Sequence, residues 1–174
     1  MSLRNTLFSL CLLLALTLPA VAGQTRDAQF LSAIDGDSLL LVIEGRSREV
    51  RLIGIDAPEH GQEYGTQARQ EILRLCYGRS LRVEYDKQRK DRYGRLLAYV
   101  YYGKTMVNAE MVRAGLALAV RYEPNTLHLD LLRAAEKEAR AKRRGFWLHG
   151  GLKRTPYEWR KLHRRGASSG KVGG

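Results

Sequence analysis

Cysteine is scarce in this chain, and its scarcity excludes several kinds of site. Two cysteines occur among 174 residues, and Cys11 lies in an N-terminal segment that we expect to be removed. The remaining Cys76 cannot form an internal disulfide. It follows Ile72, Leu73 and Leu75, so we expect a small buried side chain and not a catalytic thiol. One cysteine and four scattered histidines also disfavour a structural zinc site.

Acidic residues are in short supply as well. The chain has 30 Lys and Arg against 18 Asp and Glu, a formal net charge of +12 and a pI near 10.0. This excess favours a polyanionic partner such as nucleic acid, an anionic membrane surface or an acidic polysaccharide. The alternative is a basic surface that only keeps the protein soluble. The length suits one domain and a tail, and 44% hydrophobic residues can fill a compact core.

Long apolar runs are missing too. The run from Leu7 to Leu18 is short for a membrane span, and no stop-transfer flank follows it. Arg4 before the run and the A-x-A pattern at Ala20-Val21-Ala22 are typical of a secretory signal peptide. We therefore predict a signal peptide over residues 1–22, no membrane anchor after cleavage, and a periplasmic or secreted mature protein.

Residues 27–150 contain no repeat or low-complexity tract, and their periodic segments predict ordered elements. Hairpin-like connections such as Asp35-Gly36 join the predicted strands and favour an antiparallel sheet or barrel. Helical spacing dominates the second half, so we expect an α+β domain over residues 27–150. The expected strands are 30–34, 38–43, 48–55, 80–85 and 96–102, and the expected helices are 64–76, 107–114 and 127–144.

The composition shifts after Trp147. Residues 151–174 have few apolar residues, many basic ones and a Gly/Ser-rich end, so we expect a basic, flexible tail. Its basic and aromatic residues would add nonspecific affinity for DNA or for an anionic surface. A solvated tail without a role is the alternative. These residues are Lys153, Arg154, Arg160, Lys161, Arg164 and Arg165, with Tyr157 and Trp159.

Three short segments carry the residue types that phosphodiester hydrolysis needs. The reaction requires activation of water, neutralisation of the phosphate, and fixed geometry. Carboxylates can activate water and hold a hard cation such as Ca²⁺ or Mg²⁺. The planar guanidinium of arginine matches two phosphate oxygens. The segments are Ile34–Ser38, Arg51–Glu59 and Asp91–Tyr99.

Each segment also has an ordinary structural explanation. Asp35 and Asp37 flank a glycine, and for this segment alone an acidic hairpin turn is the favoured explanation. Asp56 ends a predicted strand and Glu59 follows it closely, as in a solvated acidic loop. Arg95 begins a strand, as in a charged hairpin with surface salt bridges.

Together, the segments resemble the staphylococcal nuclease (thermonuclease) family in order and spacing, over about residues 28–149. The resemblance implies a five-stranded OB-type β-barrel with three packed α-helices. The motifs that carry it are Ile34-Asp35-Gly36-Asp37, Arg51-Leu52, Asp56-Ala57-Pro58-Glu59 and Asp91-Arg92-Tyr93-Gly94-Arg95, with further matches at Met106–Asn108, Arg113–Ala117, Tyr122–Asn125 and Gly145–Trp147.

The resemblance also implies an activity. It is the Ca²⁺-dependent hydrolysis of DNA and RNA to products with 3′-phosphate ends, and we expect the enzyme to be a monomer. Asp37 and Asp56 would be metal ligands, together with the backbone carbonyl of Ala57. Glu59 would be the general base on the attacking water, or would position that water.

The same resemblance assigns the residues that hold the substrate. Arg51 and Arg95 would grip the phosphate, and Arg95 would also assist the leaving oxygen. Tyr93 would hydrogen-bond a phosphate of the nucleotide. We place Arg92 and Tyr122 with it among the substrate-binding residues.

Three departures from the family pattern concern the substrate. The family's type sequence has Thr where this chain has Ala57, so a hydrogen bond behind the metal ligands is missing. Its longer, lysine-rich loop after the base is shortened here to His60-Gly61-Gln62-Glu63. Its base-stacking tyrosine aligns near Val120, which puts a preference for chain ends in doubt.

A catalytically silent OB-fold module that binds single-stranded nucleic acid is the alternative function. Degenerate copies of the domain lack catalytic residues, whereas this chain has the complete set. A binding module has no reason to keep carboxylates where phosphates dock, because like charges repel. The set is Asp37, Arg51, Asp56, Glu59 and Arg95.

Overall fold

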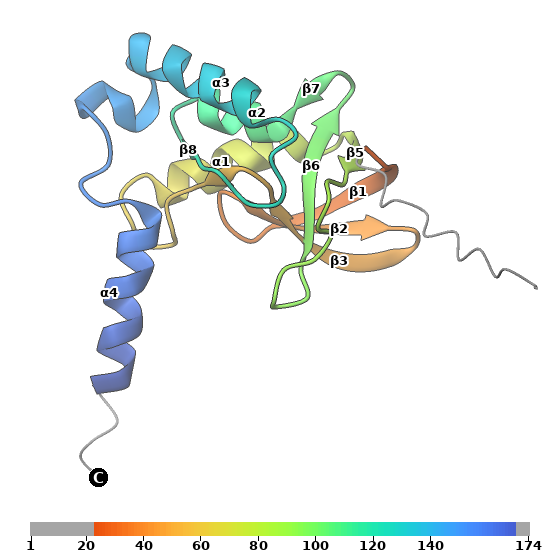
Figure 1. The fold of residues 1–174 in the computed structure, drawn as a ribbon, viewed down its shortest axis with the longest axis horizontal. Helices are drawn as coiled ribbons and strands as arrows, with labels where there is room; N and C mark the ends of the chain where they lie inside the picture. Colours follow the sequence, from red (N-terminus) through yellow and green to blue (C-terminus); the bar gives the residue numbers. More distant parts are fainter. Residues whose placement is uncertain (1–22, 170–174) are drawn as a thin grey trace, which may run out of the picture.

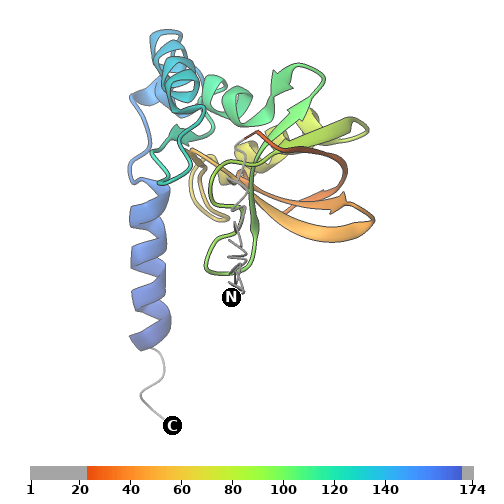
Figure 2. The same ribbon diagram turned by 45° about the vertical axis from the view of Figure 1, so that its right-hand side comes forward.

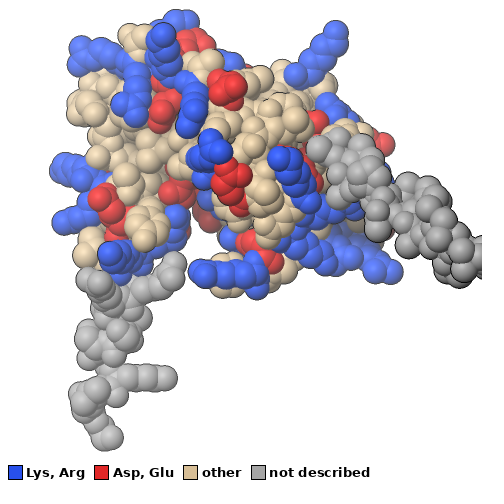
Figure 3. All heavy atoms as spheres, viewed as in Figure 1, with Lys and Arg blue, Asp and Glu red and all other residues tan. Residues whose placement is uncertain are grey.

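The computed structural model describes residues 23–169. The predicted signal peptide, residues 1–22, lies outside the described residues, as do residues 170–174. Within the described part of the chain, no helix combines the length and the apolar character needed to cross a membrane. On the face drawn in Figure 3, Lys and Arg side chains are spread widely and are interspersed with Asp and Glu.

Five strands form the closed barrel of the domain (Figure 1). They are β1 (Thr25–Ala33), β2 (Ser38–Ile43), β3 (Arg46–Leu52), β5 (Ser80–Glu84) and β6 (Leu96–Tyr102). Antiparallel neighbours follow the order β3-β2-β1-β5-β6. A parallel pairing of Val50–Leu52 with Leu96–Ala98 joins β3 to β6 and closes the barrel. The remaining strands are short: β4 (Ile55–Asp56) pairs with β8 (Leu118–Ala119), and β7 (Thr105–Met106) pairs antiparallel with the end of β6.

Three helices pack together beside the barrel (Figure 1). They are α1 (Gly65–Cys76), α2 (Val107–Arg113) and α3 (Leu129–Ala141), followed by the short 3-10 helix η1 (Gly145–His149). The predicted α+β class, with a five-stranded OB-type barrel and three packed helices, is therefore confirmed. The predicted strand and helix positions agree with the observed ones to within a few residues, with two exceptions. β1 begins earlier, and a turn at residues 53–54 divides the strand expected over 48–55 into β3 and β4.

The core follows the periodicity of the sequence. In α1, Ala68, Ile72 and Leu75 lie on one buried face, and Cys76 is fully buried beside them. Burial raises the pKa of the Cys76 thiol to about 12, so the side chain is a neutral apolar group, as predicted. Burying each leucine or isoleucine stabilises the fold by roughly 1.5–3 kcal/mol.

Asn108 ties the helices to the strands that carry the site. This buried residue of α2 accepts a hydrogen bond from the Val100 N–H on its Oδ1 at 2.9 Å. Its Nδ2 donates to the Ile53 carbonyl at 2.9 Å. The amide thus connects β6 to the turn between β3 and β4. A buried amide with both ends satisfied stabilises one arrangement of these elements.

The stretch expected to be a flexible tail contains a helix, α4 (Pro156–Ser169), which extends away from the barrel as an arm (Figures 1 and 2). A capping box starts it. The Glu158 N–H donates to Thr155 Oγ1 at 3.2 Å, and the Thr155 N–H donates to Glu158 Oε2 at 2.8 Å. Pro156 then occupies the first turn, where its missing N–H costs nothing. These local signals favour a helix in a segment whose polar composition had indicated irregular structure.

Candidate active site

The tight turn between β1 and β2 fixes the position of Asp37. The Asp37 N–H donates to Asp35 Oδ1 at 2.9 Å, and the Ile34 N–H donates to the Ser38 carbonyl at 2.9 Å. The Asp37 carbonyl accepts from the Leu52 N–H at 2.8 Å, which joins this turn to β3. Asp35 therefore shapes the turn, and Asp37 is the residue whose carboxylate turns inward.

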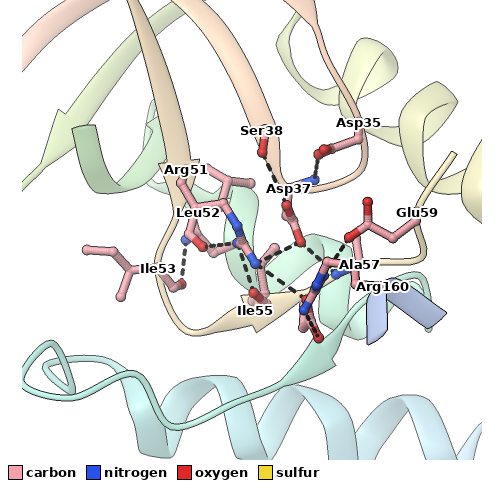
Figure 4. A network of polar contacts seen from close by, with 12 residues as sticks. Asp35, Asp37, Ser38, Arg51, Leu52, Ile53, Ile55, Ala57, Glu59 and Arg160 are labelled. Carbon is pink, nitrogen blue, oxygen red and sulfur yellow. Dashed lines mark hydrogen bonds and ion pairs between the residues drawn. The ribbon is translucent and has the colours of Figure 1, made fainter. Parts of the chain in front are cut away.

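Asp37 is 5% exposed, and its carboxylate lies in a network of polar contacts (Figure 4). Its Oδ2 accepts from the Ala57 N–H at 2.8 Å and lies 3.0 Å from Arg51 Nη2. Its Oδ1 accepts from Ser38 Oγ at 3.3 Å. Burial raises the pKa of Asp37 to about 7, although Arg51 and the Ala57 N–H act in the opposite direction. The carboxylate is thus a buried group whose charged form needs cations nearby.

Arg51, on β3, supplies one such cation and links Asp37 to Asp56. Its Nη2 lies 3.0 Å from Asp37 Oδ2 and 3.5 Å from Asp56 Oδ1. Its Nη1 donates to the carbonyls of Leu52 at 2.7 Å and Ile55 at 3.0 Å. Most of its donors are therefore used within the protein. Arg51 is a structural link between two carboxylates as well as the predicted phosphate ligand.

Asp56 and Ala57 lie at the end of β4, which pairs with β8. Both residues are buried. The Ala57 N–H binds Asp37, and the Asp56 carboxylate lies near Arg51. The turn and strand end predicted to carry metal ligands therefore meet in space, as Figure 4 shows.

Glu59 is half-buried and is held by its own backbone. Its N–H donates to Gln62 Oε1 at 3.1 Å, and its carbonyl accepts from the Gln62 N–H at 3.0 Å. Gly65 at the start of α1 lies against the same carbonyl, because a Cβ there would be 2.1 Å from the Glu59 oxygen. Glycine at this position lets the helix approach the loop that carries Glu59.

Arg95 is oriented by Asp91 at the start of β6. Its Nε donates to Asp91 Oδ2 at 2.7 Å, and its Nη1 lies 3.7 Å from Glu49 Oε1. Asp91 Oδ1 also accepts from the backbone N–H groups of Tyr93 at 2.9 Å and Arg95 at 3.0 Å. Burial raises the pKa of Asp91, but these hydrogen bonds outweigh it and hold the pKa below its usual range.

Tyr93 projects from the 91–95 turn into solvent, with 65% of its surface exposed. Its hydroxyl accepts from Arg92 Nη2 at 2.6 Å, and the Arg92 and Arg95 guanidinium carbons lie 4.8 Å and 5.6 Å from the ring centroid. An aromatic ring beside two cations suits a nucleotide.

A cleft of about 580 Å³ brings most of the predicted site residues together. Asp56 and Ala57 do not line it, although Asp56 contacts the lining residues Arg51 and Arg160. The lining residues are Asp35, Asp37, Ser38, Glu49, Arg51, Glu59, Arg92, Tyr93, Arg95, Tyr122, Tyr157 and Arg160.

Two lining residues, Tyr157 and Arg160, come from α4 and were not predicted as site residues. Arg160 Nη1 lies 2.9 Å from Asp56 Oδ1 and 2.5 Å from Glu59 Oε1, and its Nη2 lies 3.2 Å from Asp56 Oδ2. The capping box was a readable signal for the helix. No sequence signal pairs Arg160 with carboxylates 101 and 104 residues away.

The donor set suits a hard cation. Among residues 23–169, no group of three or more His, Cys, Asp or Glu side chains is gathered as a metal cluster. The oxygens at hand are those of Asp37 and Asp56 and the Ala57 carbonyl, which are ligands of the kind that Ca²⁺ takes. A guanidinium already binds Asp56 and Glu59, so this end of the barrel does hold a cationic group.

Comparison with known proteins agrees with this geometry. The family model described as Staphylococcal nuclease homologue matches residues 49–149. The chain belongs to the staphylococcal nuclease family. It is accordingly a hydrolase of the nuclease class.

Individual relatives extend the match. A protein named Thermonuclease from Staphylococcus hyicus is 38% identical over 123 residues, which cover 67% of this chain and 73% of that protein. Endonuclease YncB from Bacillus subtilis is 38% identical over 127 residues, covering 68% of this chain and 60% of that protein. An uncharacterized endonuclease from Haemophilus influenzae is 34% identical over 160 residues, covering 91% and 86%.

Proposed function

We propose that this family member is an exported, Ca²⁺-dependent nuclease that cleaves both DNA and RNA and leaves 3′-phosphate ends. One observation carries the proposal. Arg51 Nη2 lies 3.0 Å from Asp37 and 3.5 Å from Asp56, and Glu59 and Arg95 line the same cleft as Arg51. Carboxylates beside arginines in one cleft support phosphodiester hydrolysis better than simple binding.

In this proposal each residue has one chemical task. Glu59 accepts a proton from a water molecule, whose oxygen bonds to phosphorus. The bond from phosphorus to the 5′-oxygen then breaks, and the 5′-oxygen takes a proton from solvent. Arg95 stabilises the charge that develops on that oxygen, and Arg51 stabilises the phosphate oxygens through the donors that remain to it.

Asp37, Asp56 and the Ala57 carbonyl would hold the cation. Bound Ca²⁺ would supply Lewis acidity at the phosphate and orient the water. Tyr93, Arg92 and Tyr122 line the cleft and would contact the nucleotide. Arg92 and Tyr93 are exposed, whereas Tyr122 is partly buried against the core. The exposed ring of Tyr93 suits contact with flexible single strands, whose bases can stack on aromatic rings.

Cleavage of plasmid DNA and of RNA tests the proposal, with Ca²⁺, Mg²⁺ and a chelator compared. We expect activity with Ca²⁺ that the chelator abolishes, and mass spectrometry of a digested oligonucleotide should show 3′-phosphates. Glu59→Ala should lower the rate by about 10²–10⁴-fold. Glu44→Ala is the matched control, because Glu44 is an exposed carboxylate that pairs with Arg26.

The silent binding module makes the opposite prediction. It would bind DNA or RNA without hydrolysis, and Glu59→Ala would tighten binding by removing a negative charge from the cleft. Undiminished cleavage by Glu59→Ala would remove Glu59 from the mechanism.

Export and a monomeric state are proposals of their own. The Arg4, Leu7–Leu18 and Ala20-Val21-Ala22 pattern supports export. Cell fractionation with N-terminal sequencing of the mature protein tests it, and we expect a mature chain that begins after Ala22. Size-exclusion chromatography with light scattering tests the monomer, and a dimer mass would contradict it.

A further inference from the structure

We propose that Arg160 is a tethered cation that competes with the divalent ion for Asp56 and Glu59, so that α4 sets the Ca²⁺ concentration at which the site becomes loaded. This inference rests on the proposed Ca²⁺ dependence. Arg160 thereby determines the cation requirement of the enzyme through its contacts with Asp56 and Glu59.

The contacts of Arg160 are those of a bound cation. Its two Nη atoms engage both oxygens of Asp56, at 2.9 Å and 3.2 Å, and Nη1 also contacts Glu59 at 2.5 Å. Burial lowers the pKa of the guanidinium, but the hydrogen bonds to Asp56 and Glu59 outweigh it and raise the pKa above its usual value. A charge-assisted, two-point contact of this kind is stronger than an exposed surface pair.

These contacts involve the atoms that the proposed reaction needs. Asp56 cannot offer its oxygens fully to a metal ion while two guanidinium nitrogens bind them. Glu59 is engaged as well, because Arg160 Nη1 contacts its Oε1. Loading the site with Ca²⁺ therefore requires Arg160 to leave Asp56.

The segment before α4 keeps Arg160 close to the carboxylates. Gln62 Nε2 donates to the Arg154 carbonyl at 2.8 Å, and the Lys153 N–H donates to Glu63 Oε1 at 2.6 Å. Gln62 and Glu63 belong to the shortened loop that follows Glu59. The C-terminal segment thus docks on the loop where this chain departs from the family pattern. Tethering gives Arg160 a high effective concentration at Asp56 that free salt does not match.

A tethered cation that competes with Ca²⁺ lowers the apparent affinity for Ca²⁺. The apparent affinity is the intrinsic affinity multiplied by the fraction of molecules in which the site is free. Linkage also makes the effect reciprocal, so Ca²⁺ binding should release α4 from the barrel. If Arg160 formed only a structural salt bridge, it would neither lower the Ca²⁺ affinity nor be released by Ca²⁺. If its guanidinium helped to hold the loaded site, it would raise the Ca²⁺ affinity.

Isothermal titration of Ca²⁺ into the mature chain, without nucleic acid, tests the competition. We expect Arg160→Gln to lower the Kd for Ca²⁺ by about tenfold or more, the scale of a charge-assisted hydrogen bond. Arg160→Lys should give an intermediate value, because lysine is a single point charge without the planar fork. Lys161→Gln removes the same charge from an exposed neighbour on α4 and should leave the Kd within about twofold of the wild-type value.

An unchanged or higher Kd in Arg160→Gln would overturn the inference, as would equal effects of Arg160→Gln and Lys161→Gln. Hydrogen exchange on the wild-type chain gives a test without substitution. Amides of residues 157–163 should exchange faster at saturating Ca²⁺, and unchanged exchange would contradict the release of Arg160.

The outcomes also separate this inference from the proposed function. If the wild-type chain cleaves DNA but Arg160→Gln binds Ca²⁺ no more tightly, the competition fails and the nuclease function stands. If Arg160→Gln binds Ca²⁺ more tightly but neither chain cleaves nucleic acid at saturating Ca²⁺, the function fails and the competition stands. If neither chain binds Ca²⁺, both fail.

Discussion

The barrel end and helix α4 contribute to the same cleft by different means. At the barrel end, Asp37, Arg51 and Asp56 are held by strand ends, tight turns and backbone hydrogen bonds. Helix α4 starts through its own capping box, and its contacts with the site come from Arg160 and Tyr157 at its first turns. The barrel end is thus a fixed framework, whereas the position of α4 depends on a few polar contacts.

This difference allows stability and cation binding to be changed separately. Removing a buried charged group that has partners in the folded core lowers the free energy of unfolding. A peripheral helix held by a few polar contacts can change position at a small cost in free energy. We therefore expect substitutions at the barrel end to change folding and activity together, and substitutions in α4 to change cation and substrate binding with little effect on folding.

Arg51→Ala should produce the largest effect on stability. It leaves Asp37 and Asp56 without their shared cation and removes donors from two backbone carbonyls. We expect a loss of about 3–5 kcal/mol in the free energy of unfolding, measured by urea denaturation, with a loss of cleavage.

Arg95→Ala is the matched comparison. The Arg95 side chain is more exposed than that of Arg51. Asp91 keeps the Tyr93 and Arg95 backbone N–H groups as donors, so loss of the Arg95 side chain should cost about 1 kcal/mol of stability. Cleavage should nevertheless fall strongly. If Arg51→Ala is as stable as Arg95→Ala, Arg51 is not the internal link that its contacts indicate.

Asn108→Ala tests whether the framework beneath the site depends on one buried amide. The substitution leaves the Val100 N–H and the Ile53 carbonyl without their partner. The expected cost is about 2–3 kcal/mol, and cleavage should decline because the turn that leads to Asp56 loosens. Asn125, another buried amide, binds the backbone N–H and carbonyl of Gln88 away from this turn. Asn125→Ala should lower stability similarly with a smaller effect on the catalytic rate.

Much of the barrel end could be predicted from the sequence, because its signals are local. The spacing of apolar residues in the sequence predicts the strands, and Asp35-Gly36 predicts the turn that orients Asp37. The motifs around Arg51, Asp56 and Glu59 lie within nine consecutive residues. What the motifs did not indicate is that Arg51 uses most of its donors on its own chain, because that depends on carbonyl positions in the folded turn.

The contacts of the C-terminal segment were not predicted from the sequence. Thr155-Pro156-Tyr157-Glu158 is a readable helix start, but the composition of the whole segment indicated a flexible tail. The contact between Arg160 and Asp56 spans 104 residues. It depends on how the chain after η1 docks on Gln62 and Glu63, which no local pattern encodes.

Truncation after His149 should change the stability of the fold little and the binding of Ca²⁺ more. The barrel and α1 to α3 remain, so the melting temperature should shift by less than about 4 °C, the equivalent of about 1 kcal/mol for a chain of this size. Ca²⁺ binding should tighten as in Arg160→Gln. If α4 also binds nucleic acid, the slope of log K against log salt should become shallower by about 0.7–0.9 for each phosphate that the truncated chain no longer neutralises. An unchanged slope, measured by fluorescence anisotropy, would remove α4 from substrate binding.

Thr155→Ala should have the smallest effect and the most selective one. Thr155 Oγ1 accepts the Glu158 N–H, and its loss should destabilise α4 by about 1 kcal/mol while leaving the barrel unchanged. A frayed first turn holds Arg160 near Asp56 for a smaller fraction of the time, so the Kd for Ca²⁺ should fall by a few fold, less than in Arg160→Gln. Thr155→Ser keeps the hydroxyl and should behave as the wild-type chain. In the Arg160→Gln background, Thr155→Ala should then have no further effect on Ca²⁺ binding, because the cap acts on the cation site only through the arginine. An additive effect would mean that α4 influences the carboxylates by a second route.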